Sequence, residues 1–240
     1  GDHLLSARHG DSGVRRGVGP SGSEAGLRRR SVAAFLRRCR GDEAHADTVA
    51  RLALALYDGL PRPRGGRPNA RELLEYGALL HDVGYRIGYA RHHKHGEYLI
   101  RHAALAGFSR EEIDLLAALA RYHRKRGPRR RDACLARLGW DDRRTLRHLL
   151  GILRVADALD RGHAGVVDSV RVVRGRRRCT LRVRCVADGS VELREARAEA
   201  VFLEDGVGRA IAVEPEPAPM ARVWRRRLPA PALDGRVVAG

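Results

Sequence analysis

The sequence predicts a mainly α protein that ends in a small antiparallel β (α+β) domain, and three observations support this fold class. From about residue 25 to 165, apolar residues recur at the spacing of helices that face a core. From about residue 166 to 214, the pattern changes to the alternation of strands, as in Val170–Val172 and Leu181–Arg184. Nine of the 11 histidines lie between His45 and His163, which places the candidate chemistry in the helical part.

The chain divides into four segments by composition. Residues 1–24 are rich in Gly and Ser and are interpreted as a linker or the remnant of a missing N-terminal domain. Residues 25–165 form the helical domain, residues 166–214 the sheet domain, and residues 215–240 a Pro-rich tail. Asp188-Gly189 has the composition of a tight turn and predicts a hairpin between the second and third strands.

Charge and composition restrict the partners. The net charge of +18 favours a polyanionic ligand without choosing one, since an Arg bias this strong also fits a GC-rich coding sequence. With 5% aromatic residues and no nucleic-acid motif, nucleic-acid binding is disfavoured. No apolar run approaches the ~20 residues that span a bilayer, so no membrane association is expected. The four scattered cysteines argue against a disulfide framework and favour a reducing cytoplasm.

Two predicted helices direct histidines toward the core. Over residues 45–56, His45 begins a stripe that continues through Val49, Leu52 and Leu56 at helical spacing. A second helix over residues 70–83 places His81 on its apolar face, with Asp82 beside it, and Gly84 is expected to cap its C-terminus.

Three more helices follow. One is expected over residues 96–106, and Ser109 with Glu112 predicts a capping box for the next, whose apolar face leads to His123. The fifth, over residues 142–160, places Asp157 one turn beyond Leu153 on the apolar stripe.

The inward polar residues favour a shared metal ion. A carboxylate on a buried helical face costs several kcal/mol unless it is paired or bound to a cation. Asp157 could instead pair with Arg154 or Arg161, and a lone buried His is more often a hydrogen-bonded core residue than a ligand. The ordered set of His45, His81-Asp82 and Asp157, each in a suitable helical phase, is better explained by a common metal.

This set resembles the H…HD…D signature of the HD phosphohydrolase superfamily, which implies a helical HD-type domain. The resemblance implies that His45, His81, Asp82 and Asp157 hold a first metal. His92, in the His92–Gly96 step, and His123 resemble the further ligands of two-metal members, with Asp82 bridging.

Longer stretches resemble one family more closely: residues 73–84, 92–95, 120–125 and 152–161 are similar to the C-terminal half of exopolyphosphatase / guanosine pentaphosphate phosphohydrolase (Ppx/GppA) proteins. The strand-rich ending resembles that family's terminal domain. The actin-like N-terminal half, to which the family's polyphosphatase chemistry is assigned, is not in this sequence. Residues 13–18 resemble a degraded version of the segment that closes that half, with Arg16 where an acidic residue is usual.

Two functions follow from these observations. The first is a cytoplasmic, metal-dependent HD-type phosphohydrolase that acts on polyphosphate, guanosine penta- or tetraphosphate, or another nucleotide. It would use one or two divalent ions (Mn, Fe, Mg, Co, Ni or Zn), Asp82 and Lys94 in catalysis, and Lys94, Arg124 and Lys125 to bind phosphate. His93 and His95 are spare candidates for ligation or proton transfer. The alternative is a non-catalytic polyphosphate-binding or regulatory half, with an N-terminal actin-like domain or a homodimer partner.

Overall fold

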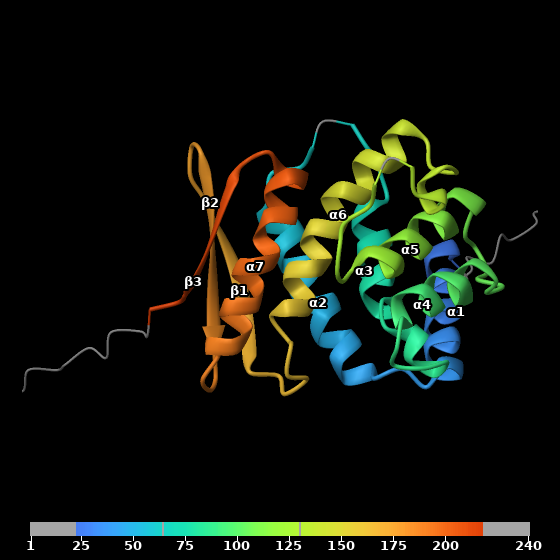
Figure 1. Cartoon of the computed structure of the whole chain (residues 1–240), viewed down its shortest axis with the longest axis horizontal. Helices are drawn as coiled ribbons and strands as arrows, with labels where there is room; N and C mark the ends of the chain where they lie inside the picture. Colours follow the sequence, from blue (N-terminus) through green and yellow to red (C-terminus); the bar gives the residue numbers. More distant parts are fainter. Residues whose placement is uncertain (1–22, 64, 130, 218–240) are drawn as a thin grey trace, which may run out of the picture.

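The computed structural model describes residues 23–63, 65–129 and 131–217 and shows a helical body beside a small sheet (Figure 1). The elements in chain order are α1 (Glu24–Cys39), α2 (Glu43–Gly59), α3 (Ala70–Leu80), the short 3-10 helix η2 (Val83–Arg86), α4 (His92–Arg101), α5 (Arg110–Tyr122), the 3-10 helix η3 (Ala133–Leu135), α6 (Trp140–Ala158), β1 (Val167–Arg174), β2 (Arg178–Cys185), α7 (Ser190–Val207) and β3 (Ala210–Pro215). The predicted linker over residues 1–24 and tail over residues 215–240 lie almost entirely outside the described residues.

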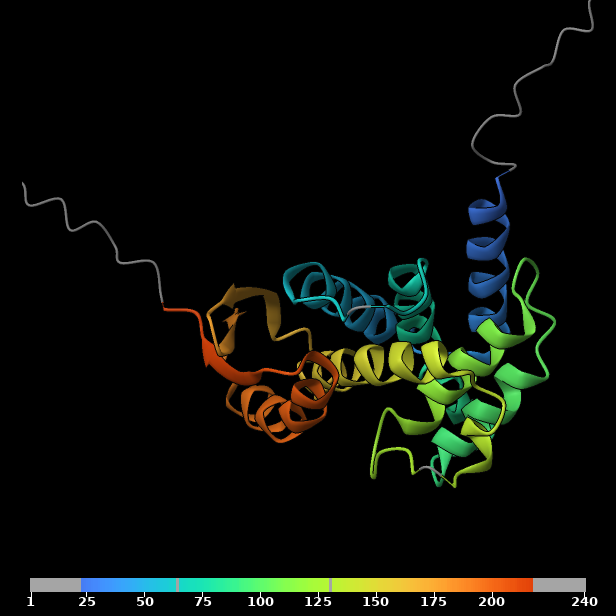
Figure 2. The same cartoon turned by 90° about the horizontal axis from the view of Figure 1, so that it is seen from above.

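Helix α6 runs through the middle of the molecule, whereas α2 and α7 pack against the sheet (Figure 2). Its buried residues include Leu149 and Leu153, which are fully shielded from solvent. On one side it packs against α2, α3 and α5, and on the other it packs closely against α7. The close approach to α7 depends on Gly151, because a Cβ atom there would lie 2.6 Å from the Cα of Leu203. The helix that carries Asp157 is therefore held on both sides.

The sheet is mixed, which corrects the prediction of an antiparallel one. Strands β1 and β2 pair antiparallel, but β2 and β3 pair parallel, in the order β1-β2-β3. Parallel neighbours need a crossover connection, and α7 supplies it. Asp188-Gly189 therefore precedes a helix instead of forming a hairpin, and Asp188 accepts a hydrogen bond from the backbone N–H of Ser190.

All five helices that were given residue ranges or caps in the sequence analysis are present, and their ends differ from the predicted ones. The predicted helix over residues 96–106 begins earlier, so that His92 lies in the first turn of α4. Ser109 and Glu112 form the predicted capping box at the start of α5.

The predicted cap at Gly84 is wrong, because Gly84 lies within η2 and its φ is not positive. Gly84 instead allows close packing: a Cβ atom there would collide with the backbone of His92 and lie 2.5 Å from the N of Gly96. No helix in the described ranges is long and apolar enough to cross a membrane.

Candidate metal centre

Six side chains from five helical segments converge at one place in the helical body. Five of them are buried, and Asp82 is partly buried. They are His45 in α2, His81 and Asp82 directly after α3, His92 in α4, His123 directly after α5, and Asp157 in the last turn of α6. Donor atoms lie within 4.8 Å of one another in the group His45, His81, Asp157 and in the group Asp82, His92, His123. The structure thus brings together all six predicted metal ligands.

The four histidines share one hydrogen-bonding pattern. The Nδ1 atom of His45 lies 2.8 Å from a carboxylate oxygen of Asp160, and Nδ1 of His81 lies 2.7 Å from the carbonyl oxygen of Ala78. His92 and His123 direct Nδ1 in the same way to the carbonyl oxygens of residues 89 and 120, at 3.1 and 2.8 Å. A carbonyl oxygen can only accept, so Nδ1 carries the hydrogen and donates it. In the neutral ring this leaves the lone pair on Nε2, which is the arrangement of metal-bound histidines.

The two carboxylate oxygens of Asp82 face different histidines. Oδ2 lies 3.9 Å from Nε2 of His45 and 3.5 Å from Nε2 of His81. Oδ1 lies 3.4 Å from Nε2 of His92 and 3.3 Å from Nε2 of His123. Ligands that bind one ion at about 2.1 Å lie roughly 3–3.5 Å from each other. Asp82 therefore has the position of a carboxylate that bridges two cation sites.

Asp157 completes the first group of donors. Its Oδ1 atom lies 3.4 Å from Nε2 of His45 and 3.5 Å from Nε2 of His81. The alternative pairing with Arg154 is not seen, because Arg154 bonds to Glu199 and to the carbonyl oxygens of residues 122 and 125.

Buried atoms without hydrogen-bond partners mark the same place. Among the described residues, Nε2 of His45, Nε2 of His81 and Oδ1 of Asp82 are buried and have no partner. An unsatisfied buried polar group costs about 1–3 kcal/mol, and three of them in one cluster would be expensive. Divalent cations would satisfy all three, and imidazole with carboxylate is a ligand set that transition metals accept. The residues therefore fit a divalent metal centre.

The carboxylates give the centre a strongly negative field. Burial lowers the pKa of His45, but the neighbouring carboxylates of Asp157 and Asp160 outweigh it and raise the pKa to about 9. Burial raises the pKa of Asp82, whereas the neighbouring His81 and His123 hold it well below its usual range. The same field that retains a proton on His45 attracts a metal cation.

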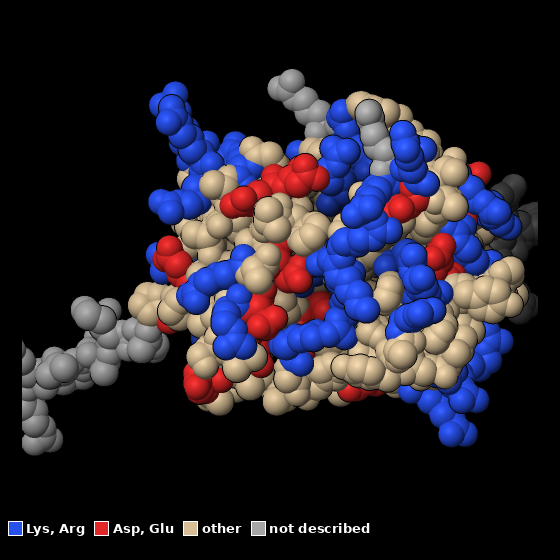
Figure 3. Space-filling view, viewed as in Figure 1, with Lys and Arg blue, Asp and Glu red and all other residues tan. Residues whose placement is uncertain are grey.

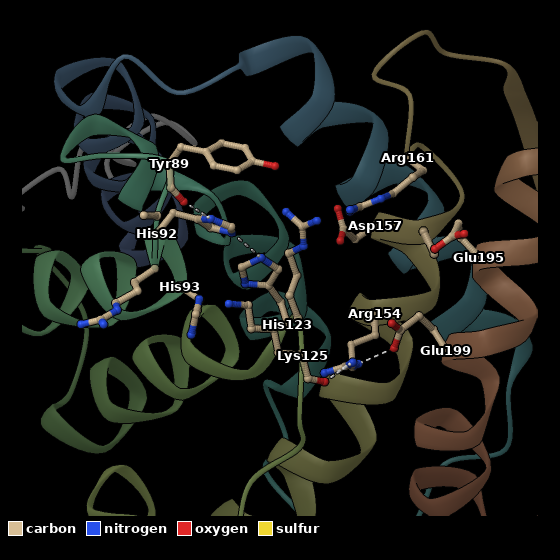
Figure 4. Close-up of a pocket in the computed structure, with 14 residues that line it drawn as sticks. Tyr89, His92, His93, His123, Lys125, Arg154, Asp157, Arg161, Glu195 and Glu199 are labelled. Atoms are coloured by element: carbon tan, nitrogen blue, oxygen red, sulfur yellow. Dashed lines mark hydrogen bonds and ion pairs between the residues drawn. The ribbon is translucent and has the colours of Figure 1, made fainter.

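A pocket of about 450 Å³ opens over the centre (Figure 4). His92, His123 and Asp157 line it, and so do the predicted phosphate-binding residues Arg124 and Lys125. The third predicted phosphate-binding residue does not: Lys94 is exposed and is not among the residues that line the pocket. His93 lines the pocket as well, and burial together with the charge of Arg121 lowers its pKa to about 4.

Several other residues of the pocket were not among the predicted site residues. Arg91 and Arg161 add positive charge to it, and Glu195 and Glu199 form an acidic wall on the side of α7 (Figure 4). Arg161 lies in the turn that follows α6, four residues beyond Asp157, and its nearness to Asp157 in the sequence could have indicated it. The glutamates could not be found, because they reach the pocket only through the crossover helix.

The surface of the molecule also has acidic side chains next to basic ones. On the face shown in Figure 3, acidic side chains gather in the middle of the view, over the position of α7 in Figure 1, and Lys and Arg side chains lie on both sides. On this face the basic residues are therefore spread over several elements and do not form one patch.

Comparison with known proteins finds one family profile and several relatives that resemble this chain. The family profile described as "Ppx/GppA phosphatase, domain III" matches residues 27–187, more than half of the 240 residues. A protein of Pseudoalteromonas translucida named guanosine-5'-triphosphate,3'-diphosphate pyrophosphatase is 31% identical over 113 residues, which are 47% of this chain and 23% of that protein. A protein of the same name from Photobacterium profundum is 32% identical over 99 residues, 41% of this chain and 20% of the relative. The chain thus matches less than a quarter of the length of these relatives.

Proposed function

The chain belongs to the Ppx/GppA phosphatase family, and we propose that its helical domain is itself an HD-type phosphohydrolase that binds two divalent metal ions. The bond it cleaves is a phosphoanhydride or phosphoester. The observation that carries the proposal is the position of Asp82, whose two carboxylate oxygens each face a separate pair of histidine Nε2 atoms.

Some residues of the site would bind the ions, and others would bind the substrate. One ion would be held by His45, His81 and Asp157, and the other by His92 and His123. Asp82 would be a ligand of both ions. Two divalent ions held there would lower the pKa of a water molecule and neutralise charge on the phosphoryl oxygens. The hydrogen bonds at Nδ1 orient the histidine rings before any ligand arrives.

The basic residues of the pocket position the phosphate chain. Arg124, Lys125 and Arg161 line the pocket that contains Asp157 and His123, so their charges would face the reacting phosphoryl group. A guanidinium can donate two parallel hydrogen bonds to one phosphate. Lys94 has no part in this mechanism, since its side chain lies outside the pocket lining.

The substrate class follows from the relatives and from the pocket. The relatives' printed name describes a pyrophosphatase of a guanosine polyphosphate, and 450 Å³ accommodates a nucleotide-sized ligand. Guanosine penta- and tetraphosphate, another nucleotide, and the end of a polyphosphate chain are the substrates to test.

A second function is supported by the charge of the chain. With a net charge of +18, the domain could act as a polyphosphate-binding or regulatory module in which the metal centre only stabilises the fold. Binding without phosphate release would be the result that favours this function.

The test begins with metal analysis. The chain is purified without added metal, supplied with Mn²⁺, and compared with Asp82→Ala and with Asp47→Ala, which removes an exposed carboxylate from α2. We expect about two equivalents in the unmodified chain and in Asp47→Ala, and a large loss in Asp82→Ala. Phosphate release from guanosine pentaphosphate and polyphosphate is then measured for all three. If the unmodified chain takes up no metal, the proposed function is refuted.

A further inference from the structure

Tyr89 carries an aromatic ring that is open to solvent at the edge of the pocket. The residue is 77% exposed, a larger fraction than that of any other exposed large hydrophobic residue in the described ranges. Its ring meets those of Tyr85 and His92 at inclined angles of 37° and 49°, with the centroids 5.6 and 6.3 Å away. Neither neighbour lies flat on the ring of Tyr89, so its face is available to a ligand.

The position of Tyr89 is tied to the metal centre. Its backbone carbonyl oxygen accepts the hydrogen bond from Nδ1 of His92, at 3.1 Å. The residue lines the pocket over the centre and, together with Arg124 and Arg161, also lines a neighbouring cavity of about 390 Å³. Its side chain points into the pocket (Figure 4). A single exposed apolar residue is common on protein surfaces, but this one lies beside two guanidinium groups that are suited to phosphate.

The pocket is not basic throughout, which favours one of the candidate substrates. Glu195 lines it from α7 and forms an ion pair with the adjacent Arg194, at 3.3 Å between the charged atoms. A polyphosphate carries negative charge along its whole length, so a carboxylate in the wall repels it. A nucleoside phosphate carries its charge at one end and an uncharged aromatic base at the other. The mixture of basic, acidic and aromatic residues therefore suits a nucleoside phosphate better.

We propose that Tyr89 is a base-stacking residue, through which the site prefers a nucleoside phosphate to a polyphosphate of the same charge. The inference rests on the proposed function and narrows its substrate class. The phosphates would lie near Arg124 and Arg161, and the base would lie on the exposed face of Tyr89. Stacking tolerates every base, since each has a π-face. Tyr89 thus distinguishes nucleotides from ligands without a base, and does not distinguish guanine from adenine.

The test compares ligands with and without a base. The unmodified chain, Tyr89→Ala and Tyr89→Phe are titrated calorimetrically in the presence of Mn²⁺. The ligands are the β,γ-imido analogues of GTP and ATP, and imidodiphosphate, which has no nucleoside. The bridging nitrogen of these probes resists hydrolysis, so binding is measured apart from turnover. Tyr98→Ala is the control, because Tyr98 is 60% exposed on α4 and lines neither cavity.

We expect Tyr89→Ala to bind both nucleotide analogues about tenfold more weakly and imidodiphosphate as tightly as the unmodified chain does. Tyr89→Phe and Tyr98→Ala should bind all three ligands like the unmodified chain, because stacking needs the ring of Tyr89 and not its hydroxyl. If Tyr89→Ala weakens all three ligands equally, or none of them, the inference is wrong although the proposed function stands. If the unmodified chain binds none of the three, the proposed function fails together with this inference.

Discussion

The Nε2 atoms of His92 and His123 lie 3.4 Å apart, although both rings use Nδ1 to donate to a backbone carbonyl oxygen. Two neutral imidazoles in this arrangement present lone pairs to each other, which is unfavourable unless a cation lies between them. In the proposed function, a cation held by the second group of donors would remove this repulsion.

The first prediction concerns the number of ions. His123→Ala should reduce bound Mn²⁺ from about two equivalents to one, because it removes a ligand of the second group and leaves His45, His81 and Asp157 in place. Elemental analysis of the purified protein measures this, with His102→Ala as the control. A variant that kept two equivalents would show that His123 is not a ligand, and one that lost both would show that the two groups do not bind separately.

The second prediction concerns the close contact between η2 and α4. Gly84→Ala would place a Cβ atom against the backbone of His92, so α4 would have to move and carry His92 with it. We expect a loss of at least 2 kcal/mol in the free energy of unfolding, on the order of an overpacked core, and loss of one bound metal ion.

Gly88→Ala is the matched control for this change, because a Cβ atom at Gly88 meets nothing within 4 Å and its φ is not positive. Urea unfolding and metal analysis of both variants give the comparison. Equal stability and metal content in the two variants would contradict the proposed reason for glycine at position 84.

Helical periodicity predicted most of the centre, because a helix fixes the direction of each side chain relative to its neighbours. His45 and Asp157 are buried, as their apolar stripes indicated. The same geometry separates Lys94 from His92, since residues two apart on a helix do not share a face, and Lys94 is exposed in α4.

The crossover helix was missed because Asp188-Gly189 suits a hairpin as well as a helix start. The signal for α7 was present nevertheless: Leu193, Ala196, Ala200 and Leu203 have helical spacing and are all buried. The acidic wall of Glu195 and Glu199 depends on how α7 docks against α6, and no local pattern contains that information.

The third prediction concerns Arg154, which joins α7 to the segment that carries His123. Its side chain is 2% exposed, bonds to Glu199 at 2.6 Å and to the carbonyl oxygens of Tyr122 and Lys125, and stacks on Phe202 at 3.8 Å. Arg154→Ala would leave these acceptors without a partner and should lower the free energy of unfolding by about 2–4 kcal/mol.

Glu199→Gln is the milder comparison, since it removes charge but keeps an acceptor, and Glu199 is partly exposed. We expect a loss of about 1 kcal/mol or less. Urea denaturation at pH 7 measures both. If Arg154→Ala were no less stable than Glu199→Gln, the contacts to the two carbonyl oxygens would not contribute to stability.

The fourth prediction is a dependence of stability on pH in the metal-free chain. The folded pKa of His45, about 9, lies above the unfolded value of about 6.5, so the native state binds this proton more tightly. The resulting stabilisation is complete below about pH 6.5 and is lost as the pH rises toward 9.

Urea unfolding in the presence of a chelator, at pH values from 6 to 10, should therefore show that the advantage of the unmodified chain over His45→Gln shrinks with increasing pH. Taking the difference between the two proteins removes the contributions of His92 and His148. Burial lowers the pKa values of these two histidines, so their effect on stability changes with pH in the opposite direction. A difference that stayed constant across this range would show that His45 does not hold a proton between Asp157 and Asp160 in the absence of metal.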